Sequence, residues 1–138
     1  MKKPVIIGAG VAGLSFGILM AKQGIRIPIY TRMPRKNEFN GILWIAPNGL
    51  RVLKKIGLDK AVLSRGKKQS KMLFSNQQLK PLIELDGQLL KKDHGNPIVA
   101  ISRQDILEIL ETKFLELGGT IHWDHKCVAK DNINGEHK

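Results

Sequence analysis

Val5-Ile-Ile-Gly-Ala-Gly-Val-Ala-Gly-Leu-Ser15 is the stretch that decides the fold of this chain. Residues 3–7 form a mainly apolar run, a pattern typical of a short buried parallel strand. Gly8, Gly10 and Gly13 follow in the spacing G-x-G-x-x-G, and a helical pattern of apolar residues begins directly afterwards. A glycine turn between a strand and a helix predicts a dinucleotide-binding β-α-β unit.

The chain after the glycine turn completes this unit. Apolar residues recur at Val11, Leu14 and Ile18 with the spacing of one helix face, and Gly24 is placed to end the helix. Residues 25–30 then alternate in polarity and predict a second strand. Because a single helix connects the two strands, they are expected to be parallel.

Each part of the glycine turn has a physical role in binding a dinucleotide. Gly8 permits the tight turn, Gly10 lets the backbone approach a pyrophosphate, and Gly13 lets the helix pack closely on the strand. Val11 and Ala12 lie in the first helical turn, where unpaired amides and the positive end of the helix dipole attract phosphate. These five residues are the predicted pyrophosphate site.

The apolar stretch at residues 5–21, which follows two lysines, also resembles a signal peptide or a membrane span. Four glycines interrupt it, at positions 8, 10, 13 and 17. Each glycine weakens a continuous helix by about 1 kcal/mol relative to alanine. We therefore expect no integral membrane segment here.

The end of the second predicted strand departs from the usual pattern. A dinucleotide-binding unit is expected to carry an acidic residue there, which holds the ribose hydroxyls. This sequence has Thr31 and Arg32 instead, and no Asp or Glu precedes Glu38. A threonine hydroxyl can bond a ribose less strongly than a carboxylate, whereas an arginine suits a 2′-phosphate. FAD and NADP therefore both remain as interpretations at this point.

Two further helices are predicted from their ends. Pro47 suits the first turn of a helix that Gly57 closes, with apolar residues between them at helical spacing. Ser102 and Asp105 form a variant capping box at the start of a later helix. Gly118-Gly119 is expected to end that helix.

Short apolar or alternating runs predict the remaining strands, at residues 72–74, 79–85, 88–90, 98–101, 120–123 and 127–129. Asn76-Gln77 and Asp86-Gly87 are interpreted as hairpin turns between the first three of these strands. Pro81 places its strand at the edge of a sheet. The sequence thus predicts an antiparallel hairpin region added to a parallel sheet.

Asn134-Gly135 is a strong signal for a hairpin turn, yet only three residues follow it. We interpret this as a chain that is cut off within a larger fold. Self-association through an unfinished sheet is then expected.

The composition excludes some classes of protein. With 42% hydrophobic and 25% charged residues, the chain is typical of a globular domain. The net charge of +11 comes from dispersed lysine pairs, and aromatic residues make up only 5%. Because there is neither a basic block nor a base-stacking surface, we expect no nucleic-acid partner.

Cysteine and histidine give no catalytic or metal site. Cys127 is the single cysteine, which excludes an internal disulfide and fits the reducing cytoplasm. Its nearness to His125 in sequence does not establish a nucleophile and base pair. His122 and His125 are three residues apart on a predicted strand and should face opposite sides. No catalytic residue and no metal ligand is assigned.

Three segments carry a resemblance to a known family. The opening stretch through Ile29-Tyr-Thr-Arg32 resembles the N-terminus of the FAD-dependent aromatic-hydroxylase (para-hydroxybenzoate hydroxylase-like) family of flavin monooxygenases. Gly41-Ile-Leu-Trp-Ile-Ala-Pro-Asn-Gly-Leu-Arg-Val-Leu53 and Ile101-Ser-Arg-Gln-Asp-Ile-Leu107 are similar to two later segments of that family, in the same order. Residues 64–97 align only loosely, and the later cofactor-binding segments of the family have no counterpart in this chain.

The resemblance implies FAD as the cofactor, NAD(P)H as its reductant, and oxygen-dependent hydroxylation of a small organic substrate that the sequence does not identify. It also implies roles for single residues. Arg32 lies near the adenosine ribose, Leu43 in the 41–45 segment lines the flavin ring, Arg103 reaches toward the flavin side and the phosphates, and the Val128 backbone meets adenine. Thr31 stands where the family has its acid.

The predicted fold class is α/β: a Rossmann-like FAD-binding domain of the glutathione-reductase type, with an incomplete parallel sheet. Residues 1–138 are expected to form the N-terminal part of an FAD/NAD(P)-binding domain that lacks its substrate domain, and activity of this chain alone is doubtful. Two alternatives stay open. One is an NADP-binding module that uses Thr31-Arg32, and the other is a non-catalytic basic remnant of the fold.

Overall fold

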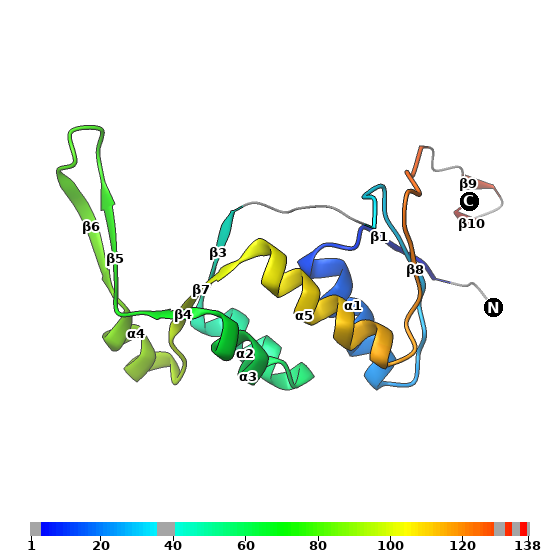
Figure 1. Cartoon of the computed structure of the whole chain (residues 1–138), viewed down its shortest axis with the longest axis horizontal. Helices are drawn as coiled ribbons and strands as arrows, with labels where there is room; N and C mark the ends of the chain where they lie inside the picture. Colours follow the sequence, from blue (N-terminus) through cyan, green and yellow to red (C-terminus); the bar gives the residue numbers. More distant parts are fainter. Residues whose placement is uncertain (1–3, 36–40, 129–131, 134–135, 138) are drawn as a thin grey trace. The chain divides into compact units, whose positions relative to one another are not determined.

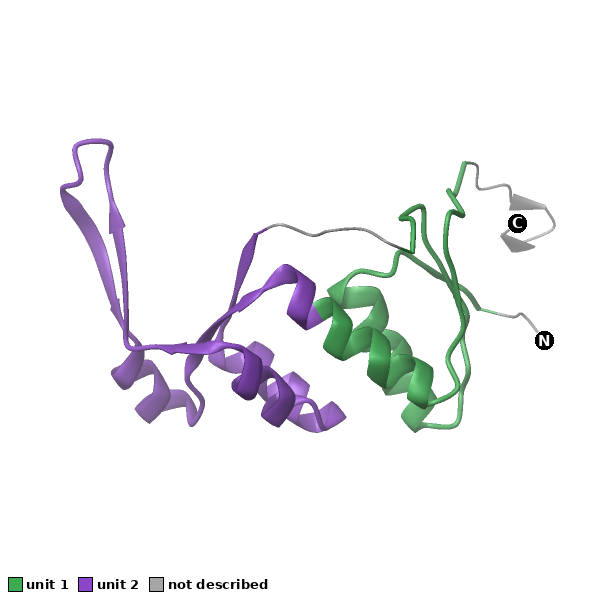
Figure 2. Cartoon of the chain, viewed as in Figure 1, with its two compact units in different colours: residues 1–39, 107–138 green, residues 40–106 purple. Residues whose placement is uncertain are grey.

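The computed structural model describes residues 4–35, 41–128, 132–133 and 136–137. The chain divides into two compact units (Figure 2). Unit 1 consists of Met1–Phe39 and Leu107–Lys138, and unit 2 of Asn40–Ile106. No helix among the described residues has the length and apolar character that crossing a bilayer requires.

Unit 1 is built on a parallel sheet of three strands. They are β1 (Ile6–Ile7), β2 (Ile29–Tyr30) and β8 (Ile121–His122), with β2 in the middle. Ile7 pairs with Tyr30, and Tyr30 pairs with His122. The strand predicted at residues 25–30 is therefore correct in direction and partner, although its ladder is limited to the last two residues.

Two helices accompany this sheet in unit 1 and lie side by side (Figure 1). They are α1 (Val11–Lys22) and the greater part of α5 (Arg103–Glu116). The Phe114 ring fills the space between them, because a Cβ at Gly17 would lie only 2.7 Å from its Cε2 atom and one at Gly119 would collide with the ring. Phe114 is 1% exposed and lies in the core.

Gly24 ends α1, as the sequence predicts. Its φ of +77° is in the left-handed region that glycine adopts without strain. The Gly24 amide donates to the Ala21 carbonyl and the Ile25 amide donates to the Met20 carbonyl, a Schellman pair of hydrogen bonds. Gly57 and Gly118 close their helices with the same pair of bonds.

Unit 2 contains an antiparallel sheet of three strands. They are β3 (Ile42–Ile45), β7 (Ile98–Ser102) and β4 (Lys67–Gln69), with β7 in the middle. The strand predicted at residues 98–101 is confirmed as β7, whereas β4 was not predicted. Lys67-Lys68-Gln69 has no apolar residue that would mark a strand, and it is ordered by pairing with β7.

Helix α2 (Pro47–Ile56) begins at Pro47 and ends before Gly57, which confirms the helix predicted from these two residues. Its apolar face buries Leu50, Leu53 and Ile56. The short helix α3 (Asp59–Arg65) follows and was not predicted. Val62 of α3 and Val99 of β7 are fully buried, so the two helices and the sheet contribute to one core in unit 2.

A hairpin extends unit 2 (Figure 1). Strands β5 (Lys71–Ser75) and β6 (Pro81–Asp86) pair antiparallel with each other alone among the described strands, which confirms the predicted hairpin and the edge position of Pro81. The Asn76 carboxamide oxygen accepts hydrogen bonds from the Gln78 and Lys80 amides and so shapes the turn.

The second predicted turn, at Asp86-Gly87, and the strand at residues 88–90 are wrong. This segment is the helix α4 (Gly87–His94). The Asp86 carboxylate accepts hydrogen bonds from the Gln88 and Leu89 amides, so Asp86 caps a helix rather than starting a turn. Gly87 lies against the Gln69 carbonyl, which leaves no room for a side chain.

The C-terminal region differs from its prediction in two respects. Cys127 and Val128 are not in a strand, and Ala129 lies outside the described residues. The strands β9 (Asn132–Ile133) and β10 (Glu136–His137) pair antiparallel, so a returning strand of two residues is present where the sequence predicted that none follows. The Asn134-Gly135 turn itself lies outside the described residues.

Valine in place of Gly17 tests the close contact between α1 and α5. The added side chain must displace the buried Phe114 ring, and we expect Gly17→Val to lower the free energy of unfolding by roughly 1–3 kcal/mol. Leu19→Val on the exposed side of the same helix is the control and should change stability little. Urea unfolding followed by circular dichroism measures both, and equal stability of the two variants would contradict the packing.

A second test uses the pH dependence of stability. Burial raises the pKa of Glu111 above its usual range, while Arg35 lowers it and Glu108 raises it further. A raised folded-state pKa favours folding below the unfolded pKa, and this contribution is lost as the pH rises through the folded pKa. Glu111→Gln should therefore raise the Tm more at pH 7 than at pH 4.

Glu116→Gln is the control, because Glu116 is an exposed residue of the same helix that pairs with Lys113 at 3.1 Å. It should give no gain at pH 7. A gain from Glu111→Gln that is the same at both pH values would show that ionisation of this carboxyl does not oppose folding.

Candidate functional site

The glycine turn leaves the parallel sheet at the carboxyl end of β1. The Gly8 amide donates a hydrogen bond of 2.7 Å to the Tyr30 carbonyl, which ties the turn to the end of β2. Gly8 has a φ of +102°, which a residue with a side chain adopts only under strain. The first glycine is therefore required by the backbone path of the turn.

The first turn of α1 is open to a ligand. Gly10 is the N-cap residue in an extended conformation, no side chain caps the helix, and no acidic residue lies in its first turn. A Cβ at Gly10 would meet no atom of the protein within 4 Å. The amides of Val11, Ala12 and Gly13 thus begin a helix whose positive end no side chain of this turn neutralises.

Gly13 has a different role from Gly10. A Cβ at this position would collide with the Gly8 carbonyl oxygen and lie 3.2 Å from the Cγ2 atom of Ile6. The absence of a side chain therefore lets α1 pack directly on β1 and its turn. Together, the open helix end and the close helix packing fit the pyrophosphate of a dinucleotide.

Thr31 lies directly after β2 and is 2% exposed. Its hydroxyl oxygen accepts a hydrogen bond from the Met33 amide at 3.4 Å. Its own amide donates to the His122 carbonyl at 3.0 Å, and its carbonyl accepts from the His125 amide at 2.8 Å. Thr31 therefore joins the end of β2 to the segment after β8.

Arg32 follows Thr31 and is exposed. Within the part of the chain that the structure describes, its guanidinium has neither a hydrogen bond nor an ion pair. It is thus the cationic side chain that stands at the carboxyl end of β2, where a dinucleotide places its ribose.

Three rings gather at this same edge of the sheet and were missed by the sequence analysis. His122 stacks on Tyr30 with ring centroids 4.4 Å apart. His125 meets both rings edge-on, at 5.8 Å from Tyr30 and 5.7 Å from His122. The prediction that His122 and His125 face opposite sides of a strand is wrong, because β8 ends at His122 and the turn at Asp124 brings His125 back.

A metal ion is not supported by this cluster of rings. No group of three His, Cys, Asp or Glu side chains that would suit a metal occurs in the described ranges. The signal that would have found the cluster is the parallel pairing of Tyr30 with His122, which a single sequence does not give.

Leu43 and Arg103, two further predicted site residues, belong to unit 2. Leu43 is half-buried in β3 and pairs with Ile101. Arg103 is the first residue of α5, and its amide donates to the Gly41 carbonyl at 2.9 Å. Its exposed side chain follows Ser102, which caps α5 by accepting from the Asp105 amide, so the predicted capping box is confirmed.

Val128, the last predicted site residue, lies in unit 1 and is 85% exposed. It is outside any strand, in contrast to the prediction. Of the ten predicted residues, the structure therefore brings together Gly8, Gly10, Val11, Ala12, Gly13, Thr31 and Arg32 at the carboxyl edge of the parallel sheet.

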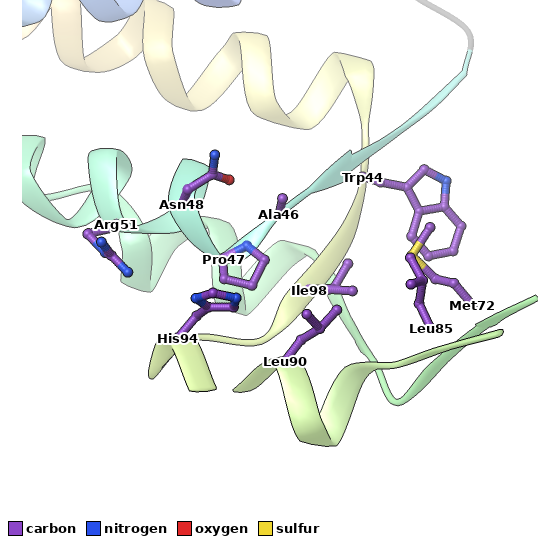
Figure 3. Close-up of a pocket in the computed structure, with 10 residues that line it drawn as sticks. All are labelled: Trp44, Ala46, Pro47, Asn48, Arg51, Met72, Leu85, Leu90, His94 and Ile98. Atoms are coloured by element: carbon purple, nitrogen blue, oxygen red, sulfur yellow. The ribbon is translucent and has the colours of Figure 1, made fainter. Parts of the chain in front are cut away.

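Unit 2 also holds a pocket of about 440 Å³ (Figure 3). Arg51 and His94 lie at one end of it, and Trp44, Met72 and Leu85 at the other (Figure 3). The complete lining consists of Trp44, Ala46, Pro47, Asn48, Arg51, Met72, Leu85, Leu90, His94 and Ile98. Apolar walls with a cationic end suit a small organic anion. Trp44 lines this pocket, whereas Leu43, the residue predicted to contact the flavin ring, lies on the opposite face of β3.

Comparison with known proteins gives the family of this chain. A profile of the family described as the FAD binding domain matches residues 2–137. Kynurenine 3-monooxygenase of Stenotrophomonas maltophilia is 30% identical over 136 residues, which cover 91% of this chain and 28% of that enzyme. 3-Hydroxybenzoate 6-hydroxylase 1 of Aquipseudomonas alcaligenes is 26% identical over 108 residues, which cover 77% and 27%.

Solved structures share the fold. The p-nitrophenol 4-monooxygenase of Pseudomonas putida superposes with a TM-score of 0.80 at 16% identity, covering 95% of this chain and 34% of that protein. A tetrameric form of 2-methyl-3-hydroxypyridine-5-carboxylic acid oxygenase gives 0.76 at 22% identity, covering 96% and 36%. The predicted α/β fold of an FAD-binding domain is thereby confirmed.

The relatives also set the extent of the match. The chain spans less than a third of the length of these curated enzymes. The resemblance to FAD-dependent monooxygenases that the sequence predicted, and FAD as the cofactor, are confirmed. Because the profile matches nearly every residue, the chain belongs to the FAD binding domain family.

Proposed function

We propose that this chain binds FAD at its glycine turn and forms the FAD-binding part of a flavin-dependent monooxygenase. The observation that carries the proposal is the open end of α1, where Gly10 has no neighbour within 4 Å of a Cβ position and no side chain caps the helix. Such an end suits the FAD pyrophosphate.

Each residue of the glycine turn has a separate role in the proposed binding of FAD. Gly8 turns the chain, Gly10 leaves space for the phosphates, and the amides of Val11, Ala12 and Gly13 donate to their oxygens. Arg32 contacts the adenosine ribose or the nearby phosphate. Thr31 supports this place mainly through its backbone, because its hydroxyl is buried and accepts from the Met33 amide.

Leu43, Arg103 and Val128 complete the proposed set, each for a separate part of FAD. Leu43 contacts the flavin ring, Arg103 contributes a positive charge toward the flavin side and the phosphates, and the backbone of the exposed Val128 meets adenine. When bound, FAD supplies the redox chemistry, since it carries electrons from NAD(P)H to oxygen. The role of the protein is to position the cofactor, and we assign no catalytic acid or base to residues 1–138.

For the whole enzyme we propose NAD(P)H as the reductant and hydroxylation of a small aromatic substrate. Support comes from the names of the relatives, which include a kynurenine monooxygenase and a hydroxybenzoate hydroxylase. We also propose that residues 1–138 are the N-terminal part of the domain and that the substrate domain belongs to a further part of the enzyme. The short match to each relative agrees with this division.

Two finer properties belong to the same proposal. A cytoplasmic location is supported by Cys127, because it is the single cysteine of the sequence and an internal disulfide is therefore excluded. Self-association is supported by β1 and β8, each of which pairs only with β2 among the described strands and so offers an unpaired edge.

Alanine at position 10 tests the binding of FAD directly. The added methyl group contacts no protein atom, so Gly10→Ala should keep the Tm, but it occupies the space into which the pyrophosphate must come. We expect the Kd for FAD to rise about tenfold or more, measured by quenching of flavin fluorescence.

Leu19→Val, on the exposed face of α1, is the matched control and should bind FAD as the unchanged chain does. Gly10→Ala with undiminished FAD affinity would contradict the proposed pyrophosphate site. An unchanged chain that binds NADPH but not FAD would instead favour an NADP-binding module that uses Arg32. Binding only to RNA or anionic vesicles would favour a basic remnant of the fold.

A further inference from the structure

The carboxyl end of β2 lacks the acid that usually accepts hydrogen bonds from a ribose, and Thr31 does not replace it. The Thr31 side chain is buried and its hydroxyl is occupied by the Met33 amide. A ribose at this edge therefore needs an acceptor from another part of the sheet. The segment that follows β8 offers such an acceptor.

His125 is fixed beside Thr31 by the backbone. Its amide donates to the Thr31 carbonyl at 2.8 Å, and the preceding Asp124 amide donates to the Met33 carbonyl at 3.1 Å. These two bonds hold the turn after β8 against the segment after β2. The imidazole of His125 is exposed, so a ligand at the sheet edge can reach it.

The hydrogen bonding of the His125 ring determines its tautomer. Its Nδ1 atom lies within hydrogen-bond distance of the Trp123 carbonyl oxygen. A carbonyl oxygen only accepts, so Nδ1 carries the proton in this contact. In the neutral imidazole the other nitrogen, Nε2, then has a free lone pair and acts as an acceptor.

The ring is also held in place by its neighbours. Its edge-on contacts with Tyr30 and His122 restrict the rotation of the imidazole, and those two rings stack on each other with an interplanar angle of 12°. An acceptor that is oriented before the ligand arrives binds with less loss of side-chain entropy. His125 thus offers what the missing carboxylate would offer, a fixed acceptor at the end of the sheet.

We propose that His125 replaces the missing acid of β2, with its Nε2 atom accepting a hydrogen bond from a hydroxyl of the adenosine ribose of FAD. This inference rests on the proposed binding of FAD at the glycine turn. His125 is then the residue that makes adenosine binding sensitive to the ribose hydroxyls.

The test compares ADP with its 2′-deoxy and 3′-deoxy forms as competitors of FAD on the full chain. We expect the unchanged protein to prefer ADP over at least one deoxy form by about fivefold to tenfold, the worth of one hydrogen bond. His125→Asn keeps a side-chain N–H near the Nδ1 position but removes the acceptor at Nε2. It should lose this preference and bind FAD more weakly by the same factor.

Two further variants keep the result interpretable. His125→Gln carries an amide oxygen that reaches the Nε2 position, and it should restore part of the preference for ADP. Asp124→Asn removes the carboxylate of the residue next to His125 in the sequence and should leave the preference unchanged. Thermal unfolding of each variant shows whether the turn is still folded.

The outcomes separate this inference from the proposed function. If the unchanged chain binds neither FAD nor ADP, the proposed function itself fails. If it binds FAD but His125→Asn discriminates ADP from the deoxy forms as before, only the role of His125 is overturned. Loss of discrimination in Asp124→Asn alone would assign the ribose contact to that carboxylate instead.

Discussion

The hydrogen bond from the Gly8 amide to the Tyr30 carbonyl is the interaction on which the carboxyl edge of the parallel sheet in unit 1 depends. At 2.7 Å it fastens the glycine turn to the end of the neighbouring strand, where the β1–β2 ladder stops. The start of α1 is then fixed by Gly13, which can approach the Gly8 carbonyl only because it has no side chain. Helix end, turn and strand end therefore form one rigid edge.

The same edge is continued across the sheet by the backbone of Thr31. Its amide and carbonyl bond to His122 and His125, so the segments after β2 and β8 are held together. The role proposed for His125 uses this arrangement, because it places a side chain from the segment after β8 at the edge where β2 lacks the usual acid.

The sequence predicted those parts of the fold that are determined locally. The first β-α-β unit, the helix between Pro47 and Gly57, the β5–β6 hairpin and the capping of α5 all follow from residues close together in the chain. Asp86-Gly87 was misread because the same two residues suit a hairpin turn and a helix N-cap, and Gln69 and Ser70 decide between them. His125 was missed for a related reason, since its position depends on pairing between strands that are about ninety residues apart.

Phe114 has a consequence for how this part of the protein can evolve. One aromatic ring occupies the space that side chains at Gly17 and Gly119 would otherwise fill. The three positions therefore share a single fixed volume, and a change at one is tolerated when another compensates for it. In related sequences a smaller residue at position 114 should accompany a larger one at 17 or 119. These three positions should therefore vary together, independently of the residues in the glycine turn.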